Sequence, residues 1–136
     1  MLAVGDSTGN GMTGAVVAND SAGALDVYRG NGTGTFTRVA CLGTPSVWRM
    51  LTADRNGAGG QDIAVFGSGG AVKVYAGAAA GLHWPGAYPA ICDRIRGGAA
   101  GDFNGDRRLD LALVWNVGRL KLLSNAGSSA FGIRPR

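Results

Sequence analysis

Short stretches in which apolar and polar residues alternate recur along this chain, and Gly-rich turns separate them. The clearest alternating stretches are residues 24–28, 71–75 and 119–123. A period of two is typical of a strand that buries one face, whereas no stretch of useful length follows the helical period. The pattern therefore predicts an all-β chain built from short strands.

A more apolar strand precedes each of these stretches, and a loop that opens with an aspartate precedes each apolar strand. The aspartates are Asp6, Asp54 and Asp102, which lie 48 residues apart. Self-similarity at such a period indicates stacked supersecondary units, because one unit cannot bury its apolar face alone. The first unit is predicted to hold strands at residues 2–5, 15–19, 24–29 and 35–41, and the later fourth strands begin near residues 82 and 130.

The repeating unit is thus an up-and-down, antiparallel unit of four strands, as a β-propeller blade requires. We predict a β-propeller array of three blades over residues 1–136, with blades at about 1–47, 48–95 and 96–136. Propellers have roughly four to eight blades, so three cannot close a ring. We expect the ring to be closed by homo-oligomerisation, with two copies joined head-to-tail into six blades.

The third Asp-opened loop has the spacing of a calcium site. Asp102, Asn104, Asp106 and Asp110 stand at positions 1, 3, 5 and 9 of the loop, and Arg108 at position 7 offers its backbone carbonyl. Ca²⁺ prefers several oxygen ligands that converge on one point, and this spacing supplies them. The alternative is an Asx-turn loop whose side chains cap its own backbone amides. Position 6, which needs positive φ and is usually Gly, is Arg107 here.

The other two loops carry fewer ligands. Asp54, Asn56 and Asp62 keep positions 1, 3 and 9 of the second loop, but Ala58 replaces the carboxylate at position 5. This set predicts a weaker second Ca²⁺ site. The first loop retains only Asp6, so we expect it to close on itself.

The third loop and the strand after it carry a family resemblance. Residues 101–106, followed by residues 110–112, resemble the repeat of FG-GAP (VCBS) propellers, which integrin α-subunit heads and many secreted proteins contain. Residues 27–36 resemble the third strand and hairpin of the same unit. The second repeat, with residues 62–67, is also similar to integrin-like lectin propellers. The resemblance implies an extracellular, secreted protein. No signal-peptide pattern precedes the first predicted strand, so the chain is either cytoplasmic as made or a piece excised or processed from a larger secreted protein, and the resemblance favours the second.

The resemblance also implies a ligand-binding face. If the Asp-opened loops join the first and second strands, the turns between second and third strands lie at the opposite end. In integrin-like heads that end engages ligand, and here it collects Trp48, Arg49, Trp115 and Asn116. A Trp beside a hydrogen-bond donor suits sugar recognition. The alternative is that Trp48 and Trp115 belong to the core between blades.

Composition narrows the function classes. The formal charge is +4, but the thirteen Lys and Arg are scattered, which gives little support for nucleic-acid binding. The apolar runs are too interrupted for a membrane span. The chain has no Glu, and His83 is its only histidine, so paired-carboxylate and Ser-His-Asp catalysis lack their usual residues. We predict that the chain is not an enzyme.

The two cysteines, Cys41 and Cys92, occupy comparable late parts of successive repeats. Corresponding points on neighbouring blades lie beyond the ~7 Å Cα limit for a disulfide, unless a long loop brings them together. Two interpretations stay open, an intrachain disulfide and a pair of small apolar side chains, and the second is favoured.

These observations lead to two hypotheses for function. The first is a non-enzymatic, calcium-supported propeller that binds a glycan or an extracellular protein. The second is a structural module, or a fragment of a larger propeller scaffold, with no ligand of its own.

Overall fold

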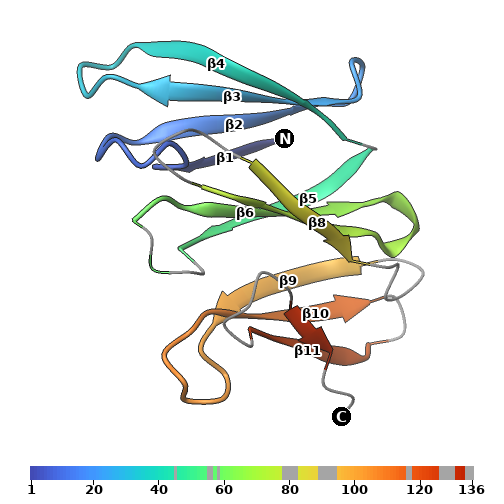
Figure 1. Ribbon diagram of the computed structural model, residues 1–136. Helices are drawn as coiled ribbons and strands as arrows, with labels where there is room; N and C mark the ends of the chain where they lie inside the picture. Colours follow the sequence, from blue (N-terminus) through green and yellow to red (C-terminus); the bar gives the residue numbers. More distant parts are fainter. Residues whose placement is uncertain are drawn as a thin grey trace.

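The computed structural model of the chain is all-β (Figure 1). It describes residues 1–44, 46–54, 57, 59–77, 83–88, 95–115, 118–125 and 131–133, with the backbone alone at 83–88 and 131–133. The helical structure in these ranges is a single 3₁₀ turn, η1 (Ser68–Gly70). No helix of the described residues is long and apolar enough to cross a bilayer.

The strands form three antiparallel sheets of four strands each. The first sheet holds β1 (Leu2–Gly5), β2 (Gly14–Asn19), β3 (Ala24–Gly30) and β4 (Phe36–Gly43). The second holds β5 (Val47–Ala53), β6 (Asp62–Gly67), β7 (Val72–Ala76) and β8 (His83–Tyr88). The third holds β9 (Ile95–Gly101), β10 (Asp110–Trp115), β11 (Leu120–Asn125) and β12 (Phe131–Ile133).

In every sheet the strands pair in chain order, each with the next, so each sheet is an antiparallel meander. The predicted up-and-down units of four strands are thereby confirmed. β5 and β9 begin at Val47 and Ile95, each the last residue of the range assigned to the preceding unit.

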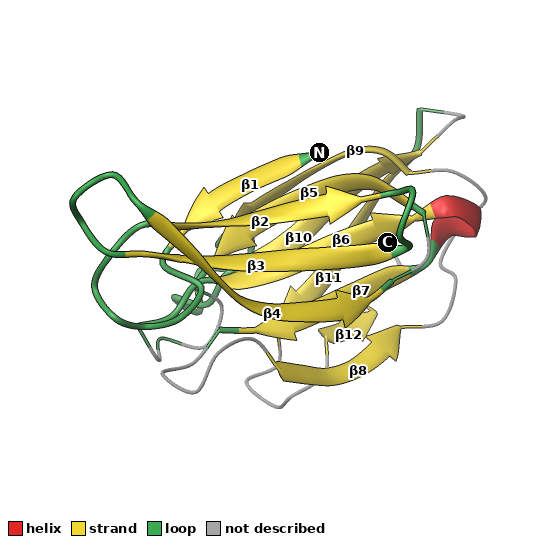
Figure 2. Ribbon diagram, turned by 90° about the horizontal axis from the view of Figure 1, so that it is seen from above, coloured by secondary structure: helices red, strands yellow, loops and turns green. Residues whose placement is uncertain are grey.

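The three sheets stack in chain order, with the first at the top and the third at the bottom of Figure 1. The first strands of successive sheets contact one another, β1 with β5 and β5 with β9. Figure 2 looks along the stack and shows these strands toward one edge, with β4 and β8 toward the other. Sheets stacked with their first strands in contact along one edge are propeller-like. The sheets form an open stack, so this chain does not close a ring by itself.

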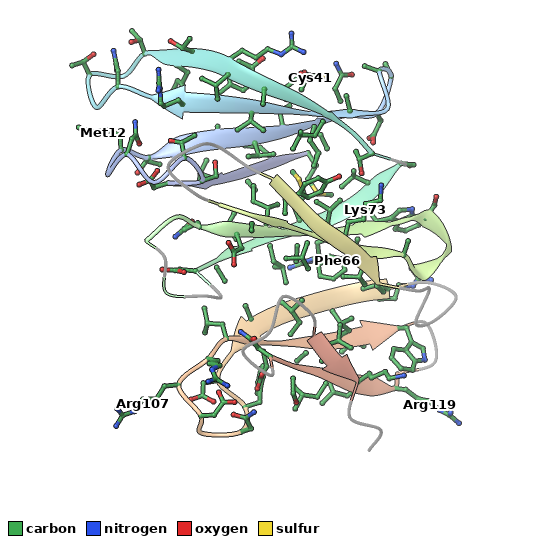
Figure 3. All side chains as sticks on the ribbon, viewed as in Figure 1. Met12, Cys41, Phe66, Lys73, Arg107 and Arg119 are labelled. Carbon is green, nitrogen blue, oxygen red and sulfur yellow. The ribbon has the colours of Figure 1, made fainter. Side chains whose placement is uncertain are left out.

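Apolar side chains fill both spaces between the sheets. Val16, Leu25 and Val27 of the first sheet pack with Ile63, Val65 and Tyr75 of the second. On the other side of the second sheet, Phe66, Val72 and Val74 pack with Leu111, Leu113 and Leu123 of the third. β2 alternates between buried and half-buried positions, whereas all of β6 is buried because a sheet covers each of its faces. Figure 3 shows Phe66 on the side of the second sheet that faces the third.

Hydrogen bonds tie the first two sheets together at both ends. The backbone N–H of Gln61 donates to the carbonyl oxygen of Asp6 over 2.7 Å, which joins the first and second Asp-opened loops. At the other end, the N–H of Val47 donates to Asp20 Oδ1 over 3.3 Å. Figure 1 shows the third Asp-opened loop at the same end of the stack as the first two, with the turns between second and third strands at the other end.

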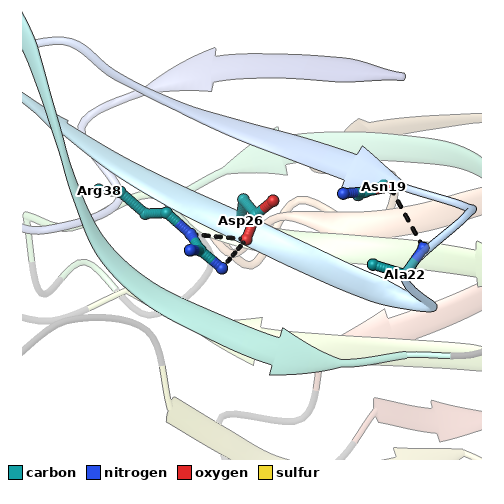
Figure 4. A network of polar contacts seen from close by, with 4 residues as sticks. All are labelled: Asn19, Ala22, Asp26 and Arg38. Carbon is teal, nitrogen blue, oxygen red and sulfur yellow. Dashed lines mark hydrogen bonds and ion pairs between the residues drawn. The ribbon is translucent and has the colours of Figure 1, made fainter.

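An ion pair crosses the outer strands of the first sheet (Figure 4). Arg38 on β4 donates from Nε to Asp26 Oδ1 on β3 over 2.8 Å, and its Nη2 lies 2.6 Å from the same oxygen. Partial desolvation works to raise the pKa of Asp26, but hydrogen bonds from Arg38 and the Cys41 thiol outweigh it and hold that pKa below 3.8. Cys41 is exposed and has a free thiol. Cys92 lies outside the described residues.

Candidate metal-binding loops and the opposite face

The Asp-opened loops share one backbone conformation. Positions 4 and 6 of every loop have positive φ, at 63° and 78° in the first, 69° and 84° in the second, and 81° and 66° in the third. Five of these six residues are glycines, and the sixth is Arg107 at position 6 of the third loop. The prediction that position 6 needs positive φ is confirmed, and Arg107 meets that need without the steric freedom of glycine.

The aspartate that opens each loop holds this turn closed. One carboxylate oxygen accepts a hydrogen bond from the backbone N–H at position 6 in all three loops. The distances are 2.7 Å from Gly11 to Asp6, 3.1 Å from Gly59 to Asp54 and 2.8 Å from Arg107 to Asp102. In every repeat, therefore, the opening aspartate caps backbone amides of its own loop, as the alternative to a metal site predicts.

The third loop has the densest set of these contacts. Asp102 Oδ1 accepts from the N–H groups of Gly105 and Asp106, at 2.7 and 3.2 Å. The backbone N–H of Arg107, followed by those of the neighbouring loop residues, holds the pKa of Asp102 below its ordinary value of 3.8. Asn104 Oδ1 accepts from the N–H of Asp106 over 2.9 Å. Asp102, Asn104 and Asp106 are all exposed to solvent.

Position 7 lies on the same exposed turn. The N–H of Arg108 donates to Asp106 Oδ1 over 2.9 Å, and Asn104 Nδ2 donates to Asp106 Oδ2 over 3.0 Å. Asp106 therefore bonds with both of its oxygens inside the loop.

Asp110, at position 9, has a different environment from the other carboxylates of its loop. It is fully buried. Its Oδ2 accepts from the N–H of Phe103 over 3.2 Å, and its Oδ1 from the N–H of Asn125 at the end of β11 over 2.7 Å. Asp110 thus ties the start of the loop to the third strand of the sheet.

The second loop repeats this link. Asp62 is 3% exposed, and its Oδ1 accepts from the N–H of Gly77 over 2.9 Å, at the same separation of 15 residues as between Asp110 and Asn125. Asp54 holds the turn with both oxygens, from Gly57 and Gly59. Asn56 and Ala58 lie outside the described residues.

The first loop closes on itself, as the sequence predicts. Asp6 accepts hydrogen bonds from Thr8 Oγ1, from the N–H of Asn10 and from the N–H of Gly11. Gly14 stands where the other repeats have Asp62 and Asp110. A Cβ at Gly14 would lie 2.4 Å from the carbonyl oxygen of Tyr28, so close packing of the backbone leaves no room for a carboxylate there.

The third loop fits Ca²⁺ in its donor chemistry, because the side chains at positions 1, 3 and 5 all offer oxygen. A carboxylate oxygen that accepts one N–H still has a lone pair for a cation. In the described part of the chain, however, no group of three His, Cys, Asp or Glu side chains is placed to hold a metal ion. Binding at this loop would therefore require its carboxylates to rearrange.

The predicted ligand-binding residues lie at the other end of the stack. Trp48 is the second residue of β5, and Trp115 is the last residue of β10. Trp48 is 47% exposed and Arg49 is also exposed, whereas Trp115 is half-buried. Asn116 lies outside the described residues. Figure 3 shows the two ends of the third sheet, with Arg107 on the Asp-opened loop and Arg119 at the opposite end.

Bulges present two of the side chains at this end. In β5, Val47 pairs with Gly67 and Arg49 with Phe66, which leaves Trp48 as the extra residue of a β-bulge. In β9, Ile95 pairs with Trp115 and Gly97 with Val114, which leaves Arg96 in the corresponding position. A bulge redirects its extra side chain. The alternating pattern of the sequence did not single out Arg96, because a bulge depends on pairing with a distant strand.

Trp115 has a basic neighbour that the sequence also did not identify. The Nζ of Lys121 on β11 lies 5.9 Å from the centroid of the Trp115 ring, within the range of a cation–π contact. The face at this end therefore combines two indole rings with exposed Arg49, Arg96 and Arg119.

Comparisons with known proteins agree with the all-β, propeller-like architecture and go no further. No protein-family model matches the chain, and no curated protein does. Among solved structures, the chain is similar to BBS1N, solved in complex with ARL6DN and soaked with lead, with a TM-score of 0.65 and 14% identity. The match covers 96% of this chain and 41% of the BBS1N chain, so this chain spans less than half the length of its structural neighbour.

Proposed function

We propose that this chain is a non-enzymatic β-propeller module, stabilised by Ca²⁺ at its third Asp-opened loop and more weakly at its second, that binds a glycan or an extracellular protein at the opposite end. The observation that carries the proposal is the bulge-presented Trp48, with Arg49 beside it, at the same end of the stack as the contact between Trp115 and Lys121. Indole rings offer a stacking face, and guanidinium groups beside them offer fixed donors.

The placement of these residues favours binding over a purely internal role. Trp48 is 47% exposed although it lies in β5, which contacts β1 and β9, next to the buried Val47. The side chains stand at the ends of strands in packed sheets, so little conformational freedom is lost on binding. The resemblance to FG-GAP propellers supports an extracellular setting. The structural neighbour BBS1N was solved with a protein bound to it, which supports the protein-partner form of the proposal.

A screen on a glycan array, followed by titration calorimetry of each hit, tests the proposal. Trp48→Ala and Trp115→Ala should each weaken binding at least about tenfold, the size of a lost stacking contact worth about 1.4 kcal/mol. Phe103→Ala is the matched control, because Phe103 is an aromatic residue of similar exposure, 51%, in the loop at the other end. Equal losses for all three variants would contradict the assignment of the face.

The second candidate is a structural module without a ligand of its own. The observation that favours it is the length of the match, since the chain spans only 41% of a longer propeller-like protein. A scaffold gives no saturable binding to any glycan, so the same array separates it from the glycan-binding form of the proposal.

A further inference from the structure

The two outermost faces of the stack carry apolar side chains of the same kind as those that pack between the sheets. We call the face of the first sheet that points away from the second the leading face, with Leu2, Val4, Val17 and Tyr28 on it. We call the corresponding face of the third sheet the trailing face, with Ala112, Val114, Leu120 and Leu122 on it. The strand registers of the repeats allow each face to be compared with an interface inside the stack.

The leading face matches the side of the second sheet that packs on the first. Leu2 pairs with Val17, as Met50 pairs with Val65, and Ala15 pairs with Tyr28, as Ile63 pairs with Tyr75. In the second sheet these positions are covered, with Met50 8%, Val65 2% and Tyr75 2% exposed. In the first sheet Leu2 is 62% exposed.

The trailing face matches the side of the second sheet that packs on the third. Val114 pairs with Leu120, as Phe66 pairs with Val72. Phe66 and Val72 are both 0% exposed, whereas Val114 is 37% and Leu120 is 65% exposed. Exposed apolar surface of this kind marks an interaction site.

We propose that the trailing face of one copy of this chain binds the leading face of a second copy, and the reverse, so that two chains close a ring of six sheets. The proposal rests on the propeller assignment above and names the partner. The occupant is a second copy because this chain already contains two interfaces in which a trailing-type face packs on a leading-type face. A head-to-tail contact that closes after two copies forms a finite ring rather than a filament.

Polar groups on the leading face do not oppose this docking. Asp26 pairs in register with Val17 and is bonded to Arg38. Lys73 stands at the corresponding place in the second sheet, paired with Val65, and is half-buried beside the first sheet. The existing interface therefore accommodates a polar side chain at this place.

Light scattering and analytical ultracentrifugation of the 136-residue chain at micromolar concentration test the proposal. The expected mass is twice the 13.7 kDa of one chain. A monodisperse monomer overturns it. Polydisperse larger assemblies also overturn it, and they would favour faces that are covered by other blades of a longer polypeptide.

Two substitutions test the head-to-tail geometry. Leu2→Lys and Leu120→Lys should each raise the dissociation constant of the dimer roughly a hundredfold, since each removes a Leu from both interfaces. Ser21→Lys, on an exposed turn outside both faces, adds the same charge and should leave the mass unchanged. Because Leu2 and Leu120 are mostly exposed in one chain, circular dichroism should show each variant folded.

Mixing the two monomeric variants gives the sharpest result. In a head-to-tail ring, a mixed pair keeps one unaltered interface, so the mixture should dimerise more tightly than either variant alone. If only Leu2→Lys dissociates the dimer, the contact is symmetric and the head-to-tail arrangement is wrong. Glycan binding by a monomeric variant separates the two proposals, because a monomer that still binds upholds the proposed function while the ring fails.

Discussion

At the scale of single residues, Asp110 differs from the carboxylates that precede it in the loop. Both of its oxygens accept from backbone N–H groups, of Phe103 and Asn125, and it is fully buried. Asp110→Ala should lower the free energy of unfolding by about 2–4 kcal/mol even in the presence of a chelator, because two donors lose their acceptor. Urea denaturation measures this. Asp106→Ala, on the exposed turn, is the control and should cost less than about 1 kcal/mol. Equal costs would contradict a structural role for Asp110.

The lowered pKa of Asp26 predicts that the stability of the folded chain depends on pH. Its pKa in the folded protein lies below 3.8, so its ionised form contributes stability at neutral pH, and this contribution is lost as the pH falls through that lowered pKa. The stability difference between the wild type and Asp26→Asn should therefore be largest at neutral pH and shrink below pH 3.8. Thermal melts across this range measure it. A difference that grows on acidification would have the wrong sign.

The positive φ of Arg107 predicts that a glycine at this position stabilises the folded chain. Its φ of 66° costs a side-chain-bearing residue roughly 1–2 kcal/mol. Arg107→Gly removes that cost, whereas Arg108→Gly removes one charge equally and adds the same freedom to the unfolded chain. Arg107→Gly should be more stable than Arg108→Gly by about 1–2 kcal/mol in urea denaturation. Equal stability would show that the loop relaxes around Arg107 without strain.

At the scale of elements, the strands were predictable because their signal is local. Alternation in residues 24–28 and the period of 48 residues place β3 and its equivalents without reference to distant contacts. Three features of the site were not predictable, because they depend on register: the bulge at Trp48, the link from Asp110 to Asn125, and the contact between Lys121 and Trp115. The spacing in the third loop indicates oxygen ligands, but it does not show that these oxygens already accept hydrogen bonds from backbone amides.

The β9–β10 loop is the element at which Ca²⁺ should act. If the ion binds the folded loop, millimolar Ca²⁺ should raise the melting temperature relative to chelator, with a gain of ~1 kcal/mol or more when the free ion exceeds its dissociation constant several-fold. Asp106→Ala should abolish most of this gain, and Asp54→Ala much less, since the second loop lacks a carboxylate at position 5. If Ca²⁺ leaves the melting temperature of the wild type unchanged, the calcium proposal is wrong.

At the scale of the whole molecule, the middle sheet has a neighbouring sheet on each face, whereas each outer sheet has a neighbour on one face only. Both faces of the middle sheet are covered, and β6 is buried along its entire length. The first and third sheets each present one comparable face to solvent, with Leu2 and Leu120 more than 60% exposed, at 62% and 65%. A ring of two copies would give every sheet the environment that the middle one already has.

Ring closure also changes how the opposite end meets a ligand. A dimer presents the face around Trp48 and Trp115 twice, so weak binding at one site becomes stronger on a surface that carries many copies of the ligand. Leu120→Lys should then dissociate faster from a glycan-coated surface than the wild type, while its affinity for the same glycan free in solution stays unchanged. Surface plasmon resonance measures the first quantity and calorimetry the second. If dissociation from the surface becomes faster and the affinity for the free glycan also falls, the substitution has damaged the binding face itself, and the separation of the end faces from the ligand face is wrong.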